Sequence, residues 1–160
     1  MTIYNEIDIL TKSPILRLQE LNTKEALSDP KILANLSEVA YKIVEVEQHL
    51  GKRLIIHDVF RCKAVNDLIF RTSPNSAHCE GLAFDFECPE YGSIYQVCCA
   101  LQRSTIRYDQ LYNEGDHVHI GLRKPFRQLQ ATFVGRFQPY LFGFHDWETN
   151  RPKDYPVLRS

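Results

Sequence analysis

Apolar residues recur every three or four positions between residues 32 and 50, for example at Leu36, Val39 and Val46. This spacing is typical of an amphipathic helix, in which such positions share one face. Gly51 follows directly, and glycine readily adopts the left-handed conformation that ends many helices. The pattern therefore predicts a helix over residues 32–50 that packs one face against the core.

A different pattern covers residues 82–88, where Leu82, Phe84 and Phe86 alternate with more polar positions that include Asp85. Such alternation predicts a strand with Asp85 on the face opposite the phenylalanines. Residues 15–21 predict a short helix that ends at the polar run 22–30. The other expected elements are a strand over 54–60, a helix over 63–70, a loop over 72–76, a helix over 91–104, and antiparallel strands over 106–112 and 117–122 around a turn at 113–116.

These elements predict an α+β fold in which N-terminal helices pack on a small antiparallel sheet. A chain of 160 residues is long enough for one domain with a full core, so we expect a single domain over residues 1–160. Residues 137–160 contain aromatic residues and prolines without periodicity, and we interpret them as a C-terminal extension laid over the domain. On this interpretation the tail aromatics cover the core rather than bind a ligand; they are Tyr140, Phe142, Phe144 and Trp147.

Composition narrows the possible partners. The net charge is −1 and the pI is about 6.6, which argues against general nucleic-acid binding, although basic residues gather locally at Arg123, Lys124, Arg127 and Arg136. No apolar run approaches the roughly 20 residues that span a bilayer, and no secretory signal is evident. We therefore expect a monomer that is made in the cytoplasm, does not bind membranes, and reaches other compartments only after release. The five cysteines are odd in number and form no C-x-x-C pair, so we expect them to be reduced.

Candidate metal ligands occur in two segments, S-A-H-C-E-G-L-A-F-D over residues 76–85 and D-H-V-H-I over residues 116–120. They contain two histidines and a carboxylate, His78, Asp85 and His119, which is a ligand count typical of catalytic zinc. A zinc ion held in this way leaves a position for water and lowers the pKa of that water to about 7 in favourable sites. The two segments therefore predict a zinc-dependent hydrolase.

The first segment resembles the S-x-H-x-x-G-x-A-x-D signature of zinc D-alanyl-D-alanine carboxypeptidases and phage L-alanyl-D-glutamate endopeptidases. F-R-C-K-A-V-N over residues 60–66 is similar to the segment of that family built on Y-R-S, with Cys62 in place of the serine. Y-D-Q-L-Y-N-E-G-D-H-V-H-I over residues 108–120 is similar to its F-D-Q-L-I-x-E and W-V-H-I segments. The resemblance covers about residues 35–122, and it implies a small α+β fold that cleaves peptidoglycan stem peptides.

Carried over residue by residue, the resemblance makes His78, Asp85 and His119 the zinc ligands. It places Arg61 at the substrate, where a permanently charged guanidinium would steady the developing negative charge. Ser76 matches the signature serine and Asn66 matches an asparagine of the same region, so both are candidate substrate-binding residues.

The general base has three candidates. Asp116 occupies the position three residues before the last ligand, where the family has an acid, and is favoured by this spacing. Glu114 matches the glutamate of the D-Q-L-x-x-E segment. His117 replaces the tryptophan of the family and should point to the same side of a strand as His119. It would assist Asp116, replace it as the base, or close the zinc site as a further ligand.

The resemblance therefore implies a zinc peptidase that hydrolyses the L-Ala–D-Glu or D-Ala–D-Ala bond of peptidoglycan stem peptides. The missing secretory signal favours a phage-type endolysin, with a cytoplasmic enzyme that cleaves the D-Ala–D-Ala dipeptide as another possibility. The alternative is a non-catalytic phage virion or binding protein that keeps the peptidase fold.

Overall fold

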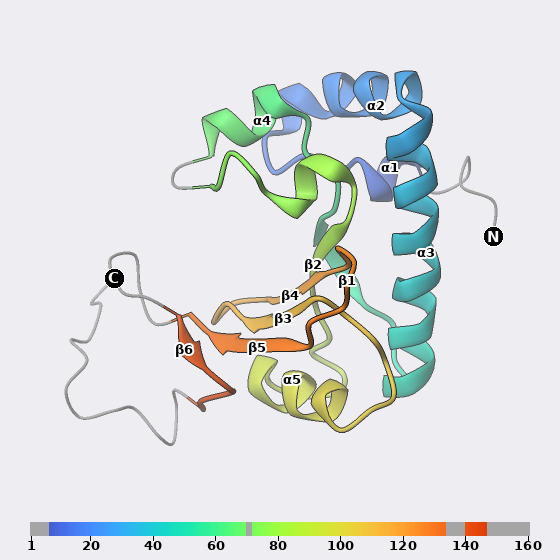
Figure 1. The fold of residues 1–160 in the computed structure, drawn as a ribbon. Helices are drawn as coiled ribbons and strands as arrows, with labels where there is room; N and C mark the ends of the chain where they lie inside the picture. The colour runs from blue at the N-terminus through green and yellow to red at the C-terminus, as the bar shows by residue number, and fades with distance from the viewer. Residues whose placement is uncertain (1–6, 70–71, 134–139, 147–160) are drawn as a thin grey trace.

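The structure is a computed structural model that describes residues 7–69, 72–133 and 140–146 (Figure 1). The helices are α1 (Ile7–Leu10), α2 (Gln19–Ser28), α3 (Pro30–Leu50), α4 (Lys63–Leu68) and α5 (Ile94–Gln102), with short 3-10 helices η2 (Leu16–Leu18) and η3 (Ala77–Glu80). The strands are β1 (Ile55–Asp58), β2 (Ala83–Glu87), β3 (Gln110–Asn113), β4 (Val118–Gly121), β5 (Leu129–Thr132) and β6 (Leu141–Phe142). The predicted α+β class is confirmed.

The strands form a six-stranded sheet in the order β1-β2-β4-β3-β5-β6. Four of the five pairs are antiparallel, but β3 and β5 are parallel, so the expectation of an antiparallel sheet is wrong in this detail. The expectation that the helices come first is also wrong, since α4 and α5 lie between strands in the chain. β5 was not predicted, because Leu-Gln-Ala-Thr shows no clear alternation of apolar and polar residues. Its pairing with β3 also joins two segments that are not adjacent in the chain.

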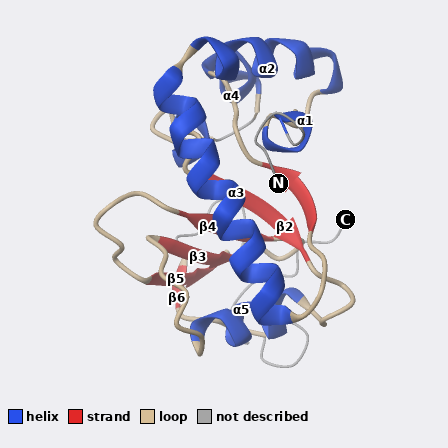
Figure 2. Ribbon diagram, turned by 90° about the vertical axis from the view of Figure 1, so that its right-hand side faces the viewer, coloured by secondary structure: helices blue, strands red, loops and turns tan. Residues whose placement is uncertain are grey.

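The long helix α3 follows from local signals at both ends. The side chain of Asp29 accepts hydrogen bonds from the backbone N–H groups of Lys31 and Ile32, and Pro30 occupies the first turn. At the other end Gly51 adopts the left-handed conformation, with φ of 64°. Leu36, Val39, Val46 and Leu50 are buried, as their spacing predicts, and α3 crosses the sheet in Figure 2.

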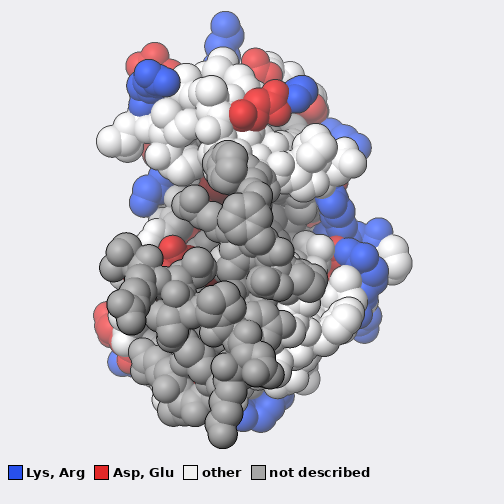
Figure 3. Space-filling model, turned by 90° about the vertical axis from the view of Figure 1, so that its left-hand side faces the viewer, with Lys and Arg blue, Asp and Glu red and all other residues white. Residues whose placement is uncertain are grey.

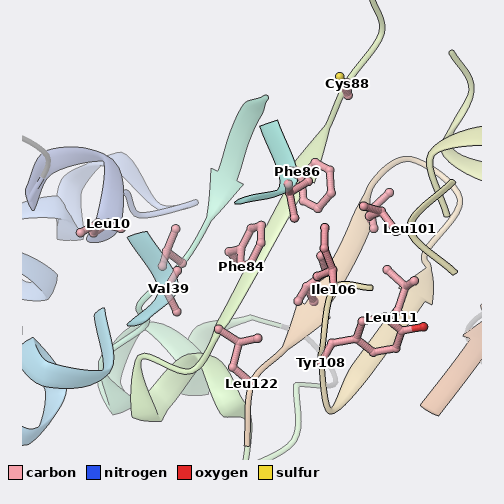
Figure 4. Close-up of a cluster of buried hydrophobic side chains, with 14 of the residues drawn as sticks. Leu10, Val39, Phe84, Phe86, Cys88, Leu101, Ile106, Tyr108, Leu111 and Leu122 are labelled. Atoms are coloured by element: carbon pink, nitrogen blue, oxygen red, sulfur yellow. The ribbon is translucent and has the colours of Figure 1, made fainter. Parts of the chain in front are cut away.

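The main core lies on one face of the sheet, between the strands and the helices α3 and α5 (Figure 4). Phe84 and Phe86 of β2 are fully buried there beside Leu111 of β3 and Ile120 of β4. Because strand residues alternate between faces, Asp85 and His119 point to the other face. The core thus holds the strands in register, while the opposite face carries the polar side chains.

Helix α2 is longer than its sequence indicates. The polar run 22–30 was expected to end a helix at residue 21, but α2 continues to Ser28. Asn22 and Ala26 are fully buried on its inner side. A buried asparagine cannot be distinguished from a solvent-exposed one by polarity alone, and this explains the error.

The described part of the tail lies along the edge of the sheet. Among the described residues of the predicted extension, Leu141 and Phe142 form β6 at the sheet edge. Phe144 packs against the core as expected, but Tyr140 and Phe142 are exposed, and Trp147 lies outside the described residues. The structure contains the five cysteines as free thiols.

Candidate metal centre and active site

The candidate ligands come from three elements. Ser76 accepts a hydrogen bond from the backbone N–H of His78 at the start of η3, and Gly81 ends η3 with φ of 64°. Asp85 of β2 and His119 of β4 are direct partners in the antiparallel register of these strands. Asn35 of α3 donates a hydrogen bond of 2.7 Å to the carbonyl of Glu80, which ties η3 to the long helix.

The ligand atoms lie close together. His78 Nε2 is 3.3 Å from His119 Nδ1 and 3.3 Å from Asp85 Oδ2, and His119 Nδ1 is 2.8 Å from Asp85 Oδ1. Two ligand atoms about 2.0–2.1 Å from one tetrahedral zinc ion are about 3.3–3.4 Å apart. The structure therefore brings the three predicted ligands together at nearly the spacing that zinc requires. Two imidazoles and a carboxylate are also a donor set that zinc accepts.

The orientation of His78 is set by the backbone. Its Nδ1 lies 2.7 Å from the carbonyl oxygen of Val59, an arrangement that places the ring proton on Nδ1 and leaves the Nε2 lone pair facing the cluster. His78 is nearly fully buried, so few other ring orientations are open to it. On the other side of the cluster, the ring of Tyr112 stacks on His119 with 5.7 Å between centroids.

In the cluster, the negative charge of Asp85 and the positive charge of a protonated His78 stabilise each other. Burial alone would raise the pKa of Asp85, but the charge of His78 and the hydrogen bonds from His119 and His78 hold it well below its usual range. Burial would likewise lower the pKa of His78, whereas the Asp85 carboxylate raises it above its usual value. A buried carboxylate between two imidazoles is thus kept as an anion, which is the form that binds a cation.

Arg61 lies beside this cluster. Its backbone N–H donates to the carbonyl of His78 at 3.2 Å, and its Nη2 donates to Ser76 Oγ at 3.2 Å. Asn66 is buried and binds the carbonyl of Ser73 at 3.0 Å, so it shapes the loop over residues 72–76. The structure therefore places Arg61 and Ser76 at the cluster, whereas Asn66 acts on the loop beside them.

Two buried polar residues of this region were missed by the sequence reasoning. Asp58 Oδ2 is 3.2 Å from Arg61 Nε and 3.9 Å from His78 Nδ1. Burial raises the pKa of Asp58, against the opposing charges of His78 and Arg61. Asn22 donates to the carbonyl of Phe60 at 3.1 Å and accepts from the N–H of Cys62 at 2.9 Å, so it holds Arg61 from both sides. In the sequence, the one sign of a role for Asp58 is its position three residues before Arg61.

The β3–β4 turn brings the candidate bases to different places. His117 Nε2 lies 3.7 Å from Asp85 Oδ2, and His117 Nδ1 is hydrogen-bonded to Asp116 Oδ1 at 2.6 Å. The Asp116 side chain is 88% exposed, so His117 lies between it and the cluster. Glu114 instead accepts a hydrogen bond of 2.6 Å from the hydroxyl of Tyr140.

Among the described residues, the candidate metal site has three protein ligands and no fourth. Within the described ranges, His78, Asp85 and His119 form the one group of at least three possible ligands whose atoms all lie within 4.8 Å of one another. His117 is adjacent to this group without belonging to it. The arrangement resembles an open catalytic site more than a closed structural one, since three protein ligands leave a position for water.

The basic cluster near residue 123 is largely neutralised. Arg123 pairs with Glu80 at 2.6 Å, Lys124 with Glu38 at 3.0 Å, and Arg127 with the buried Asp109 at 2.5 Å. Arg136 lies outside the described residues. On the face drawn in Figure 3, Lys and Arg side chains gather along the right-hand edge, and acidic side chains are seen at the top and on the left. These ion pairs brace η3, α3 and β3 and leave little free positive charge for an anionic polymer.

Comparison with known proteins identifies a family of peptidases that this chain matches. No curated protein matches the chain. The model of the Peptidase M15 family matches residues 10–121, a range that begins earlier than the resemblance noted from the motifs and includes all three candidate ligands. With a match over most of its length, the chain belongs to the Peptidase M15 family.

Proposed function

We propose that this protein is a zinc-dependent peptidase that hydrolyses an amide bond in peptidoglycan stem peptides. The single observation that carries the proposal is the cluster of His78, Asp85 and His119, whose ligand atoms lie 2.8–3.3 Å apart, close to the spacing around one tetrahedral zinc ion. Membership of the Peptidase M15 family supports a peptidase in particular. The substrate class follows from the resemblance of residues 60–66, 76–85 and 108–120 to peptidoglycan-cleaving enzymes.

When bound, zinc would polarise the scissile carbonyl and lower the pKa of the attacking water. The ring nitrogens of His78 and His119 and the carboxylate of Asp85 would hold it. Arg61 presents a guanidinium beside the cluster, and its pairing with Asp58 fixes the orientation of that group. Its role is to bind the carbonyl or carboxylate of the substrate as negative charge develops.

His117 is the best-placed proton acceptor. Asp116 accepts the hydrogen bond from His117 Nδ1, so the free lone pair of the ring lies on Nε2, which faces Asp85. His117 would take a proton at Nε2 from the attacking water and return it to the leaving amine. Asp116 then orients the imidazole, and Glu114 is engaged with Tyr140. Asp116, which the spacing favours, stays the second candidate for the base.

We further propose the L-Ala–D-Glu or D-Ala–D-Ala bond as the target and a phage-type endolysin as the biological role, with a cytoplasmic D-Ala–D-Ala dipeptidase as the nearest variant. Among the described residues, no helix is long and apolar enough to cross a membrane. A non-catalytic virion or binding protein of the same fold has less support. Loss of catalysis would remove the constraint on the ligand cluster, yet all three ligands are present and aligned.

The test combines elemental analysis for zinc with mass spectrometry of purified peptidoglycan digested by the protein. We expect one zinc ion per chain and new stem-peptide fragments whose masses identify the cleaved bond. His119→Ala should abolish both results, whereas His57→Ala, at an exposed histidine of β1, should leave both intact. A protein that binds zinc but releases no fragment would support the non-catalytic alternative. A protein that does neither would contradict the proposal as a whole.

A further inference from the structure

A row of aromatic side chains extends from the candidate metal centre along the sheet. Tyr112 of β3 is the cross-strand partner of His119 and stacks on its ring. Tyr140, just before β6, packs on Tyr112 with 5.1 Å between ring centroids, and Phe133 packs on Tyr140 at 5.6 Å. These residues are brought together by the pairing of β4 with β3, β3 with β5 and β5 with β6. Tyr140 and Phe133 both lie beyond the residues that match the family.

Tyr140 is held in place while part of its side chain stays accessible. Its hydroxyl donates a hydrogen bond of 2.6 Å to Glu114 Oε1, and 41% of the residue is exposed. Burial and the neighbouring Glu114 carboxylate raise the pKa of Tyr140, so its hydroxyl keeps the proton that it donates to Glu114. An exposed aromatic ring that is fixed at both its face and its hydroxyl is suited to contact a ligand, because little rotamer freedom remains to be lost.

The two sides of the centre differ in chemistry. On the side of His78, Arg61 and Ser76 offer a charged group and a hydroxyl. On the side of His119, Tyr112 and Tyr140 offer aromatic ring faces. Binding sites commonly combine an apolar wall with a few fixed polar groups, and the polar groups set the orientation of the ligand. A peptide bound at this centre would meet polar groups at one end and an apolar wall at the other.

We propose that Tyr140, supported by Tyr112 and anchored by Glu114, is a specificity-determining wall that contacts an aliphatic side chain of the substrate on the His119 side of the centre. This inference rests on the proposed peptidase function. The substrate group that it selects is a small alkyl side chain, such as the methyl of an alanine residue next to the cleaved bond. Residues beyond the family match thereby take part in substrate recognition.

The experiment measures kcat and KM for a stem peptide and for two analogues in which the alanine on either side of the cleaved bond is replaced by glycine. One missing methyl group in an apolar site changes kcat/KM by about tenfold or more. We expect this loss in the wild type for one of the two analogues. In Tyr140→Ala the full peptide should lose about tenfold in kcat/KM, mainly through KM, and the same analogue should show no further loss. Tyr140→Phe keeps the ring and its contact with Tyr112 but loses the hydrogen bond to Glu114, so it should retain most of the discrimination.

The matched control is Tyr41→Ala, which removes a tyrosine that is 79% exposed on α3, far from β6 (Figure 1). It should behave as the wild type. If Tyr140→Ala discriminates between the peptides as the wild type does, the inference is wrong even though the peptidase function stands. If the zinc-loaded wild type cleaves none of the peptides, the proposed function itself has failed. Zinc content and thermal unfolding of each variant separate loss of a contact from loss of the fold.

Discussion

At the scale of single residues, two neighbours in sequence that are candidate bases differ in where their side chains point. Asp116 and His117 are neighbours, yet one is almost fully exposed and the other faces the ligand cluster. Arg61 is likewise held by two other buried residues, since Asp58 pairs with its guanidinium and Asn22 binds the backbone on both sides of it. Buried residues thus set the orientation of the groups that we propose to act on the substrate.

The division between Asp116 and His117 predicts unequal losses of activity. His117→Ala removes the proposed proton acceptor and should lower kcat by about 10²–10⁴-fold. Asp116→Ala removes only the partner of Nδ1 and should cost less, because the ring remains. Steady-state kinetics on a stem peptide, with zinc content measured in parallel, decides the order. A larger loss for Asp116→Ala than for His117→Ala would make Asp116 the base.

Asn22 should matter more for stability than its position in a polar run implies. Asn22→Ala removes hydrogen bonds to the carbonyls of Thr11 and Phe60 and to the N–H of Cys62 in a fully buried place. Unpaired buried groups of this kind should lower the free energy of unfolding by about 2–4 kcal/mol, measured by urea denaturation. Asn75→Ala, at an exposed asparagine of the loop, should change it little. Equal effects of the two substitutions would contradict the assigned role.

At the scale of elements, the centre depends on how η3 joins β2. The short helix η3 carries His78, and Gly81 turns the chain into β2, which carries Asp85. Arg123, which follows β4, binds Glu80 of η3 through two nitrogens. The helix, the strand and the segment after β4 are therefore locked together, and a shift of η3 would change the spacing of the ligands.

Two glycines with the same φ of 64° allow this dependence to be tested. A Cβ atom at Gly51 would meet nothing within 4 Å, but one at Gly81 would lie 3.3 Å from the side chain of Leu36. Gly51→Ala should cost about 1–2 kcal/mol from the left-handed backbone alone. Gly81→Ala should cost more, because Leu36 must also move, and it should weaken zinc binding. Thermal unfolding and zinc titration measure both effects; similar results for the two variants would show that the contact with Leu36 is unimportant.

At the scale of the whole molecule, the proposed zinc ion would join distant parts of the chain. Its ligands come from η3, β2 and β4, and the core behind them includes α3 and α5. A ligand that binds only the folded state stabilises it according to its concentration and affinity. The centre would therefore stabilise the fold as well as carry out catalysis.

Zinc should accordingly raise the melting temperature. At a free concentration one hundred times the dissociation constant, the gain in the free energy of unfolding should be about 2.7 kcal/mol. A chelator should reverse the gain, as measured by calorimetry. His119→Ala should melt at the same temperature with and without zinc. A similar zinc-dependent shift in that variant would indicate binding elsewhere.

By itself the sequence determined the α+β class, the long helix α3, the strand β2 with Asp85 opposite the phenylalanines, and the three candidate ligands. These features depend on local periodicity, on end signals such as Gly51, and on residue types in a fixed order, all of which can be read along the chain. Only the tertiary structure decided that His117 stands between Asp116 and the ligands, that Asp58 and Asn22 hold Arg61, and that Tyr140 packs on Tyr112, the neighbour of His119. The physical reason is that these contacts join segments far apart in sequence, or depend on which way one side chain points in a turn. Neither a long-range contact nor the direction of a side chain in a turn produces a periodic pattern in the sequence.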